Sequence, residues 1–80
     1  MYYIATFFSH FGAIRFKREC LQEGREAQLM PVPRSLSSSC GTCVRFQAPP
    51  EYAPGPDIHG ELEQIVRETA EGYEVIYDGK

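Results

Sequence analysis

Two turn-rich segments divide this chain of 80 residues into short pieces. Residues 31–41 contain two prolines, four serines and a glycine, and residues 49–56 contain four prolines and a glycine. Proline and glycine interrupt helices and strands, so both segments are expected to be loops. A chain this short forms one domain and buries only about 60% of the surface that its unfolded form exposes. We therefore expect a single domain over residues 2–77, followed by a polar tail at residues 78–80.

The spacing of apolar residues between these loops predicts two helices and four strands. Each helix follows a residue that caps helix N-termini well, Ser9 or Asp57, and each ends at a glycine, as C-termini often do. The second helix depends on an apolar stripe formed by Ile58, Leu62, Ile65, Val66 and Thr69. The helices are expected at residues 11–23 and 58–71, and the strands at residues 2–8, 27–32, 42–48 and 73–77.

This order, β-α-β-β-α-β, predicts an α+β fold of the ferredoxin-like class. Its antiparallel sheet has four strands, and both helices cover one face. Right-handed crossovers leave a gap between the first and second strands, which the third strand fills. The strand at residues 2–8 is then central and apolar on both faces. The face without helices would be open in a monomer, so we expect a homodimer or another partner there.

Composition excludes several classes of protein. The net charge is −3 and basic residues are scattered, which argues against nucleic-acid binding. The N-terminus lacks the basic start of a signal peptide, and no apolar run approaches the roughly 20 residues that span a bilayer. The three cysteines exclude a fully paired disulfide framework. The expected compartment is the cytoplasm, where thiols stay reduced.

The polar loop also concentrates the reactive side chains, because Cys40 and Cys43 form the run CGTC. In the expected topology this loop lies at the end of the sheet where the first helix begins. A helix N-terminus carries about half a positive charge and favours a thiolate, so Cys40 is the candidate nucleophile. His10 lies at the same end, as a proton shuttle or a solvated turn residue. His59 is expected at the opposite end, far from Cys40.

Other residues of the loop are candidates for holding an anion, because successive backbone N–H groups can form an anion-binding concavity. These candidates are Arg34, Ser37, Ser38, Ser39 and Gly41. Arg34 and Arg45 bracket the loop, and each is either a clamp for an anion or thiolate, or an ordinary solvated or cross-strand charge. The acidic residues between positions 57 and 74, Glu63 among them, are expected to form a solvated face.

The chain resembles a known family at these residues, the selenium/sulfur (Se/S) carrier protein-like family. Its members share a motif close to P-x-P-R-x-[IL]-S-S-x-C-G, which runs here from Pro31 to Gly41. The resemblance covers about residues 2–77. It implies that the Cys40 thiol accepts sulfane sulfur or selenium from a donor protein and hands it on to an acceptor. The chain departs from the family pattern at Cys43, where an aliphatic residue is usual, and in its longer proline-rich stretch.

Several alternatives remain open. Cys43 is either a resolving thiol for Cys40 or a small packed strand residue, and Cys20 is expected to be buried. A thiol–disulfide switch would need the Cα atoms of Cys40 and Cys43 within roughly 4.4–6.8 Å. A second class of function is a regulatory or interaction module that binds an anion or small ligand at the loop. A single C-x-x-C is weak evidence for zinc, so we expect no metal or cofactor, and a carrier more than a stand-alone enzyme.

Overall fold

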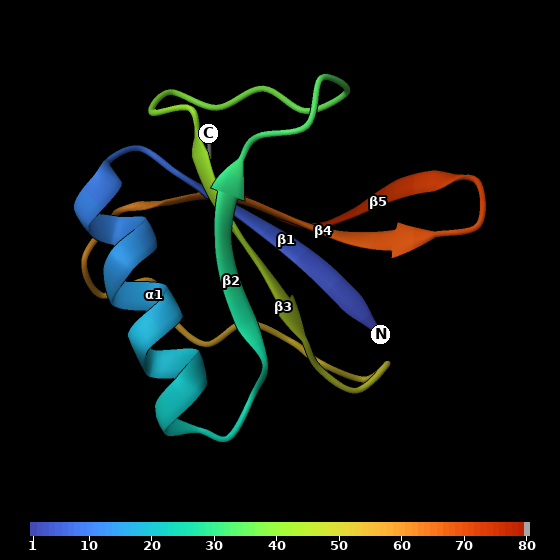
Figure 1. Ribbon diagram of the computed structural model, residues 1–80, viewed down its shortest axis with the longest axis horizontal. Helices are drawn as coiled ribbons and strands as arrows, with labels where there is room; N and C mark the ends of the chain where they lie inside the picture. The colour runs from blue at the N-terminus through green and yellow to red at the C-terminus, as the bar shows by residue number, and fades with distance from the viewer. Residues whose placement is uncertain (80) are drawn as a thin grey trace.

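The computed structural model describes residues 1–79, which form a five-stranded antiparallel sheet with one helix against it (Figure 1). The elements in chain order are β1 (Tyr2–Phe7), α1 (His10–Gln22), β2 (Ala27–Pro31), β3 (Thr42–Gln47), β4 (Leu62–Thr69) and β5 (Gly72–Asp78). The strand order is β2-β3-β1-β4-β5. The expected ferredoxin-like β-α-β-β-α-β fold, with four strands and two helices, is therefore wrong.

The first half of the chain has the predicted elements in the predicted order. β1 is the central strand, and β3 pairs with both β1 and β2, so it fills the gap between them. Helix α1 begins where expected, because the Ser9 hydroxyl accepts a hydrogen bond from the Gly12 N–H at 3.1 Å. Gly24 follows the helix with a φ of 78°, a conformation that glycine adopts without strain.

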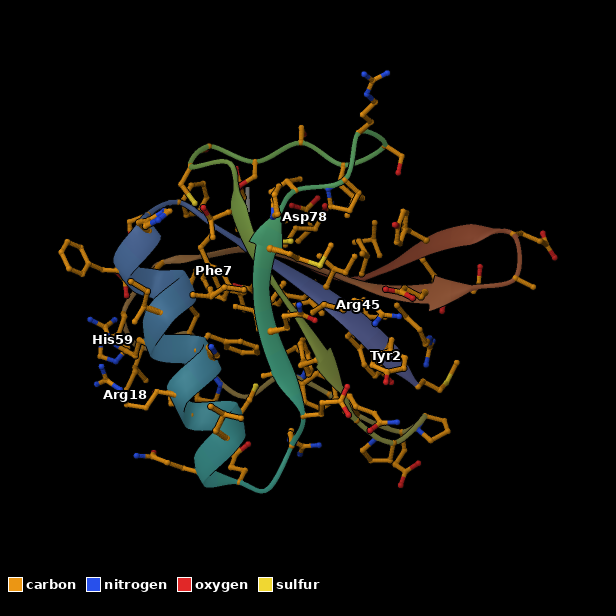
Figure 2. All side chains as sticks on the ribbon, in the orientation of Figure 1. Tyr2, Phe7, Arg18, Arg45, His59 and Asp78 are labelled. Atoms are coloured by element: carbon orange, nitrogen blue, oxygen red, sulfur yellow. The ribbon has the colours of Figure 1, made fainter. Side chains whose placement is uncertain are left out.

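The core lies between α1 and one face of the sheet, and aromatic rings fill its centre. Phe46 of β3 stacks on Tyr3 of β1, with ring centroids 5.4 Å apart, and meets Phe16 of α1 edge-on at 5.1 Å. Phe7 also packs against Phe16, and Figure 2 shows its side chain directed towards the helix. Tyr52 reaches this cluster from the proline-rich loop, and its ring centroid lies 5.1 Å from that of Tyr3. That loop is thus anchored against the core.

The predicted second helix is instead strand β4, with a hairpin to β5. Thr6 pairs with Gln64 and Phe7 with Leu62, so Glu63 is an extra residue, a β-bulge, in β4. The bulge puts Leu62 and Ile65 on the same face despite their spacing of three. Val66 points to the other face, and β4 is buried on both, which produces an apolar spacing that resembles a helix. Ile58, the first residue of the expected stripe, is 79% exposed.

The face of the sheet opposite α1 carries a smaller apolar cluster. Ile4, Cys43 and Val66 are buried there, and Met30, Val32 and Leu36 pack over them. Farther along this face Tyr73 and Val75 of β5 are exposed.

The end of the chain is only partly the polar tail that we expected. β5 extends to Asp78, and the Gly79 N–H donates to the carbonyl of Glu63 at 2.9 Å, while Lys80 lies outside the described residues. Within residues 1–79, no helix has the length and apolar character needed to cross a bilayer.

Candidate functional site

The loop between β2 and β3 crosses above the end of the sheet at which α1 begins (Figure 1). The Ser38 hydroxyl donates to the carbonyl of Phe7, the last residue of β1, at 3.3 Å. This end is the one expected from the parallel directions of β1 and β2. The turn at the start of the loop is closed by the Leu36 N–H, which donates to the Pro33 carbonyl at 3.0 Å.

Cys40 is half-buried in this loop and packs against the helix side of the core. Its Sγ donates to the Thr42 carbonyl at 3.4 Å and lies 4.0 Å from the Ser38 hydroxyl. The next residue, Gly41, has a φ of 76°, which favours glycine, and its carbonyl accepts the Val32 N–H at 3.2 Å. The Cys40 thiol is therefore directed to the Thr42 carbonyl, with the Ser38 hydroxyl beside it.

The other two thiols are buried. Cys20 lies in α1 and is 3% exposed, as expected from its place on the apolar stripe, and burial raises its pKa to about 11. Cys43 in β3 is fully buried, and burial, followed by the nearby Cys40, raises its pKa to about 11 as well. The raised pKa values disfavour the thiolate, which is the nucleophilic form, at both positions.

Cys40 and Cys43 belong to opposite faces of the sheet. Cys40 packs with the cluster under α1, whereas Cys43 packs with Ile4 and Val66 and its Sγ donates to the Pro31 carbonyl at 3.7 Å. All three cysteines are free. In this conformation Cys43 is a packed strand residue, and a disulfide with Cys40 would require the start of β3 to rearrange.

The donors that we assigned to an external anion are in part used by the protein itself. The Ser39 N–H donates to one carboxylate oxygen of Glu63 at 3.1 Å, and the Ser39 hydroxyl donates to the other at 2.9 Å. Glu63 is 4% exposed, so the expectation that it belongs to a solvated face is wrong. The spacing of apolar residues in the sequence could not predict the burial of Glu63, because Glu63 is the bulge residue of β4 and falls outside the regular alternation of the strand. Ser37 is exposed on the same loop.

The two arginines that bracket the loop have different environments. Arg34 is exposed in the turn after β2. Arg45 lies on the face opposite α1, where its guanidinium binds both carboxylate oxygens of Glu68, at 2.6 and 2.9 Å. The guanidinium also lies 3.8 Å from the centroid of the Tyr2 ring, and Figure 2 shows the two side chains together. Arg45 is therefore a cross-strand charge, and Glu68 already occupies its hydrogen-bonding edge.

Neither histidine contacts Cys40 in a described interaction. His10 is the exposed first residue of α1, at the end of the sheet where the Cys40 loop lies. His59 is also exposed, but it belongs to the loop between β3 and β4 and lies beside α1 (Figure 2), not at the start of a second helix. Among residues 1–79, no three His, Cys, Asp or Glu side chains are grouped so as to hold a metal ion.

Comparison with known proteins identifies a family. The model of the family described as "Putative Se/S carrier protein-like" matches residues 2–53, more than half of the chain. The match ends before β4 and is shorter than the resemblance over residues 2–77 that we expected. No curated protein and no solved structure matches the chain.

Proposed function

We propose, because this chain belongs to the "Putative Se/S carrier protein-like" family, that it carries a sulfur or selenium atom on the thiol of Cys40. The observation that carries this proposal is the contrast among the three thiols. Cys40 is the partly exposed one and lies within the matched residues, in the motif that ends at Gly41. Cys20 and Cys43 are buried, and burial raises the pKa of each thiol.

The chemistry of sulfur transfer makes modest demands on the carrier. A donor protein presents a persulfide, and the Cys40 thiol first loses its proton to solvent. The Cys40 thiolate attacks the outer sulfur of the donor persulfide, the donor S–S bond breaks, and the donor leaves as a thiolate. The new Cys40 persulfide keeps the proton of the outer sulfur, so no net oxidation occurs. Transfer to an acceptor thiolate repeats the same exchange, and selenium follows the same scheme.

Two features of the loop suit this exchange. The attacking thiol must be reachable from outside, and Cys40 lies on a surface loop between Ser39, whose side chain is short, and Gly41, which has no side chain. The Ser38 hydroxyl lies 4.0 Å from the Cys40 sulfur and can donate to a thiolate by rotating its proton away from the Phe7 carbonyl. On this proposal the protein is a carrier more than a stand-alone enzyme, and the donor and acceptor would be cytoplasmic proteins.

The partner surface is a further proposal. The sheet face opposite α1 exposes Tyr73 and Val75, which are 39% and 53% exposed. We propose that a second copy of this chain covers that face, which leaves the Cys40 loop at the sheet end free for donor and acceptor.

Persulfide loading tests the carrier proposal directly. The protein is incubated with an inorganic polysulfide, and the added sulfur is located by mass spectrometry after alkylation of persulfides. We expect sulfur on Cys40 in the wild type, no loading in Cys40→Ser, and normal loading in the controls Cys20→Ala and Cys43→Ala. Loading of Cys40→Ser at the wild-type level, with the fold intact, would overturn the proposal.

A further inference from the structure

Glu63 is the one buried charged side chain among residues 1–79. A carboxylate is costly to bury unless hydrogen bonds replace its water. The bulge between Leu62 and Gln64 makes Glu63 the extra residue of β4, so no residue of β1 is paired with it. Bulges of this kind re-aim a side chain and often lie next to functional sites.

Both oxygens of the Glu63 carboxylate are bound by the residue that precedes Cys40. Ser39 donates its N–H to one oxygen at 3.1 Å and its hydroxyl to the other at 2.9 Å. Hydrogen bonds to an ionised acceptor are stronger than neutral ones, and two of them fix an orientation. On the other side of Cys40, the Gly41 carbonyl is held by the Val32 N–H. Both residues that flank Cys40, Ser39 and Gly41, are thus held by hydrogen bonds.

The contact between Ser39 and Glu63 joins a part of the chain that the family model matches to a part that it does not match. Ser39 and Cys40 lie within the matched residues 2–53, whereas Glu63 lies beyond them. The family motif therefore does not account for the partner of Ser39. The fixed position of the thiol loop depends on a segment that is a β-hairpin in this chain.

We propose that Glu63 is a positioning residue for Cys40: its carboxylate holds Ser39 and thereby sets how far the Cys40 thiol is exposed when it reacts. The biological role of this positioning rests on the proposed carrier function, because a carrier needs a thiol that partner proteins can reach but that is protected from adventitious oxidants. Its physical content, the control of Cys40 exposure, is measurable without any sulfur donor.

The experiment compares four variants with the wild type. Glu63→Ala removes both hydrogen bonds, and Ser39→Ala removes the one made by the hydroxyl. Glu63→Gln keeps an acceptor for the Ser39 N–H and offers a donor to its hydroxyl oxygen, so it is the conservative rescue. Glu51→Ala, at an exposed position, controls for net charge. Native-state hydrogen exchange at Ser39, the rate of Cys40 alkylation by iodoacetamide and the melting temperature are measured for each.

In Glu63→Ala we expect faster exchange of the Ser39 amide and at least about tenfold faster alkylation of Cys40, because both hydrogen bonds that hold Ser39 are lost. Ser39→Ala should fall between this variant and the wild type. Glu63→Gln should lie within about threefold of the wild type, because it restores the acceptor for the amide. Should Glu63→Ala fail to fold, the Ser39→Ala and Glu63→Gln pair gives the same ordering.

A lower melting temperature with unchanged exchange and alkylation at these positions would show that Glu63 is merely structural, and the proposal would be overturned. The same holds if Glu51→Ala changes alkylation as much as Glu63→Ala does. The carrier function has its own separate test: if the wild type takes no sulfur from polysulfide while the variants still change Cys40 alkylation, the positioning role stands and the carrier proposal falls.

Discussion

At the scale of single residues, the buried thiols make the stability of the fold depend on pH. Burial raises the pKa of Cys20 and of Cys43 from the ordinary thiol value of about 9 to about 11. Above pH 9 the unfolded chain has released these protons but the folded chain retains them, so stability falls as pH rises. The slope is about 1.4 kcal/mol per pH unit for each retained proton.

We therefore expect the free energy of unfolding to decrease steadily as pH rises from about 9 to about 11. Tyr52, whose pKa burial raises to about 12, extends the decrease beyond that window. Urea unfolding followed by circular dichroism over this range measures the slope. The double variant Cys20→Ala, Cys43→Ala should have a shallower slope, and an equal slope in that variant would rule the thiols out as its source.

A second residue-scale prediction concerns Gly12 in the first turn of α1. A Cβ atom at this position would lie 2.9 Å from the Cβ of Glu61 and 3.2 Å from the ring of Phe7. Alanine normally stabilises a helix relative to glycine by about 1 kcal/mol. Here we expect Gly12→Ala to destabilise the protein by about 1–3 kcal/mol, because the helix must move away from Glu61 and Phe7.

Thermal and urea unfolding of Gly12→Ala measure this cost. Gln22→Ala, at the exposed last residue of α1, is the matched control and should change stability by less than about 0.5 kcal/mol. A Gly12→Ala protein more stable than the wild type would show that α1 does not depend on this close approach.

Local residue chemistry could be predicted where it depends on neighbours in the sequence. The N-cap at Ser9 and the glycine after α1 follow from short-range hydrogen bonds and φ angles, and the burial of Cys20 follows from helical spacing. The carboxylate of Glu63 is different. Its burial depends on a bulge and on a serine 24 positions away, and no local pattern encodes either.

At the scale of elements, the error at β4 has a physical cause. Apolar residues at Leu62, Ile65 and Val66 have helical spacing, but a helix places all three on one face. In the structure Ile65 lies on the α1 side of the sheet and Val66 on the other, because side chains alternate along a strand. Both are buried, since β4 is covered on both faces at this point. The β-branched side chains favour a strand, and the Ala70–Glu71 turn closes the hairpin through the hydroxyl of Thr69.

The ion pair between Arg45 of β3 and Glu68 of β4 links the two strands that lie on either side of β1. The hydrogen bonds from Arg45 lower the pKa of Glu68, so the pair stabilises the fold above the ordinary glutamate pKa and loses its effect as pH falls through the lowered value. We expect Glu68→Gln to cost about 1 kcal/mol at neutral pH, the upper end for a partly exposed pair.

Urea unfolding of the wild type and Glu68→Gln at neutral and acidic pH tests this expectation. The two curves should converge once Glu68 is protonated in the folded wild type. Glu71→Gln, at an exposed turn position, should match the wild type at both pH values. A difference between wild type and Glu68→Gln that is as large in acid as at neutral pH would show that the ion pair is not its cause.

At the scale of the whole molecule, the sheet is covered unequally on its two faces. α1 packs over β1, β2 and β3 on one face, where Tyr52 joins the core, whereas Met30, Val32 and Leu36 cover only the middle of the other face. The exposed apolar residues there, Tyr73 and Val75, lie at its β5 edge. The loop that carries Cys40 thus also supplies part of the cover of this face, through its first residues.

The proposed homodimer must bury enough of this face to be stable. A standard interface takes about 800 Å² from each partner, roughly a sixth of the 4844 Å² that one chain exposes. Tyr73 and Val75 cannot supply that area alone, so the interface must extend over the hollow lined by Leu36, Gln64 and Val66 beside them. We expect a wild-type dimer that dissociates in Val75→Glu, because a carboxylate there would be buried without a partner.

Sedimentation equilibrium over a range of concentrations measures the assembly state. Val75→Thr keeps the branched shape and the strand preference of valine, so it should dimerise far better than Val75→Glu, while circular dichroism confirms that both variants fold. At about millimolar protein concentration, even a dimer with a binding free energy of only about −4 kcal/mol would be detected. A wild type that is still monomeric at that concentration would contradict the dimer proposal. In that case Val32 and Leu36 suffice to cover the open face, and Tyr73 and Val75 are ordinary exposed residues of an edge strand.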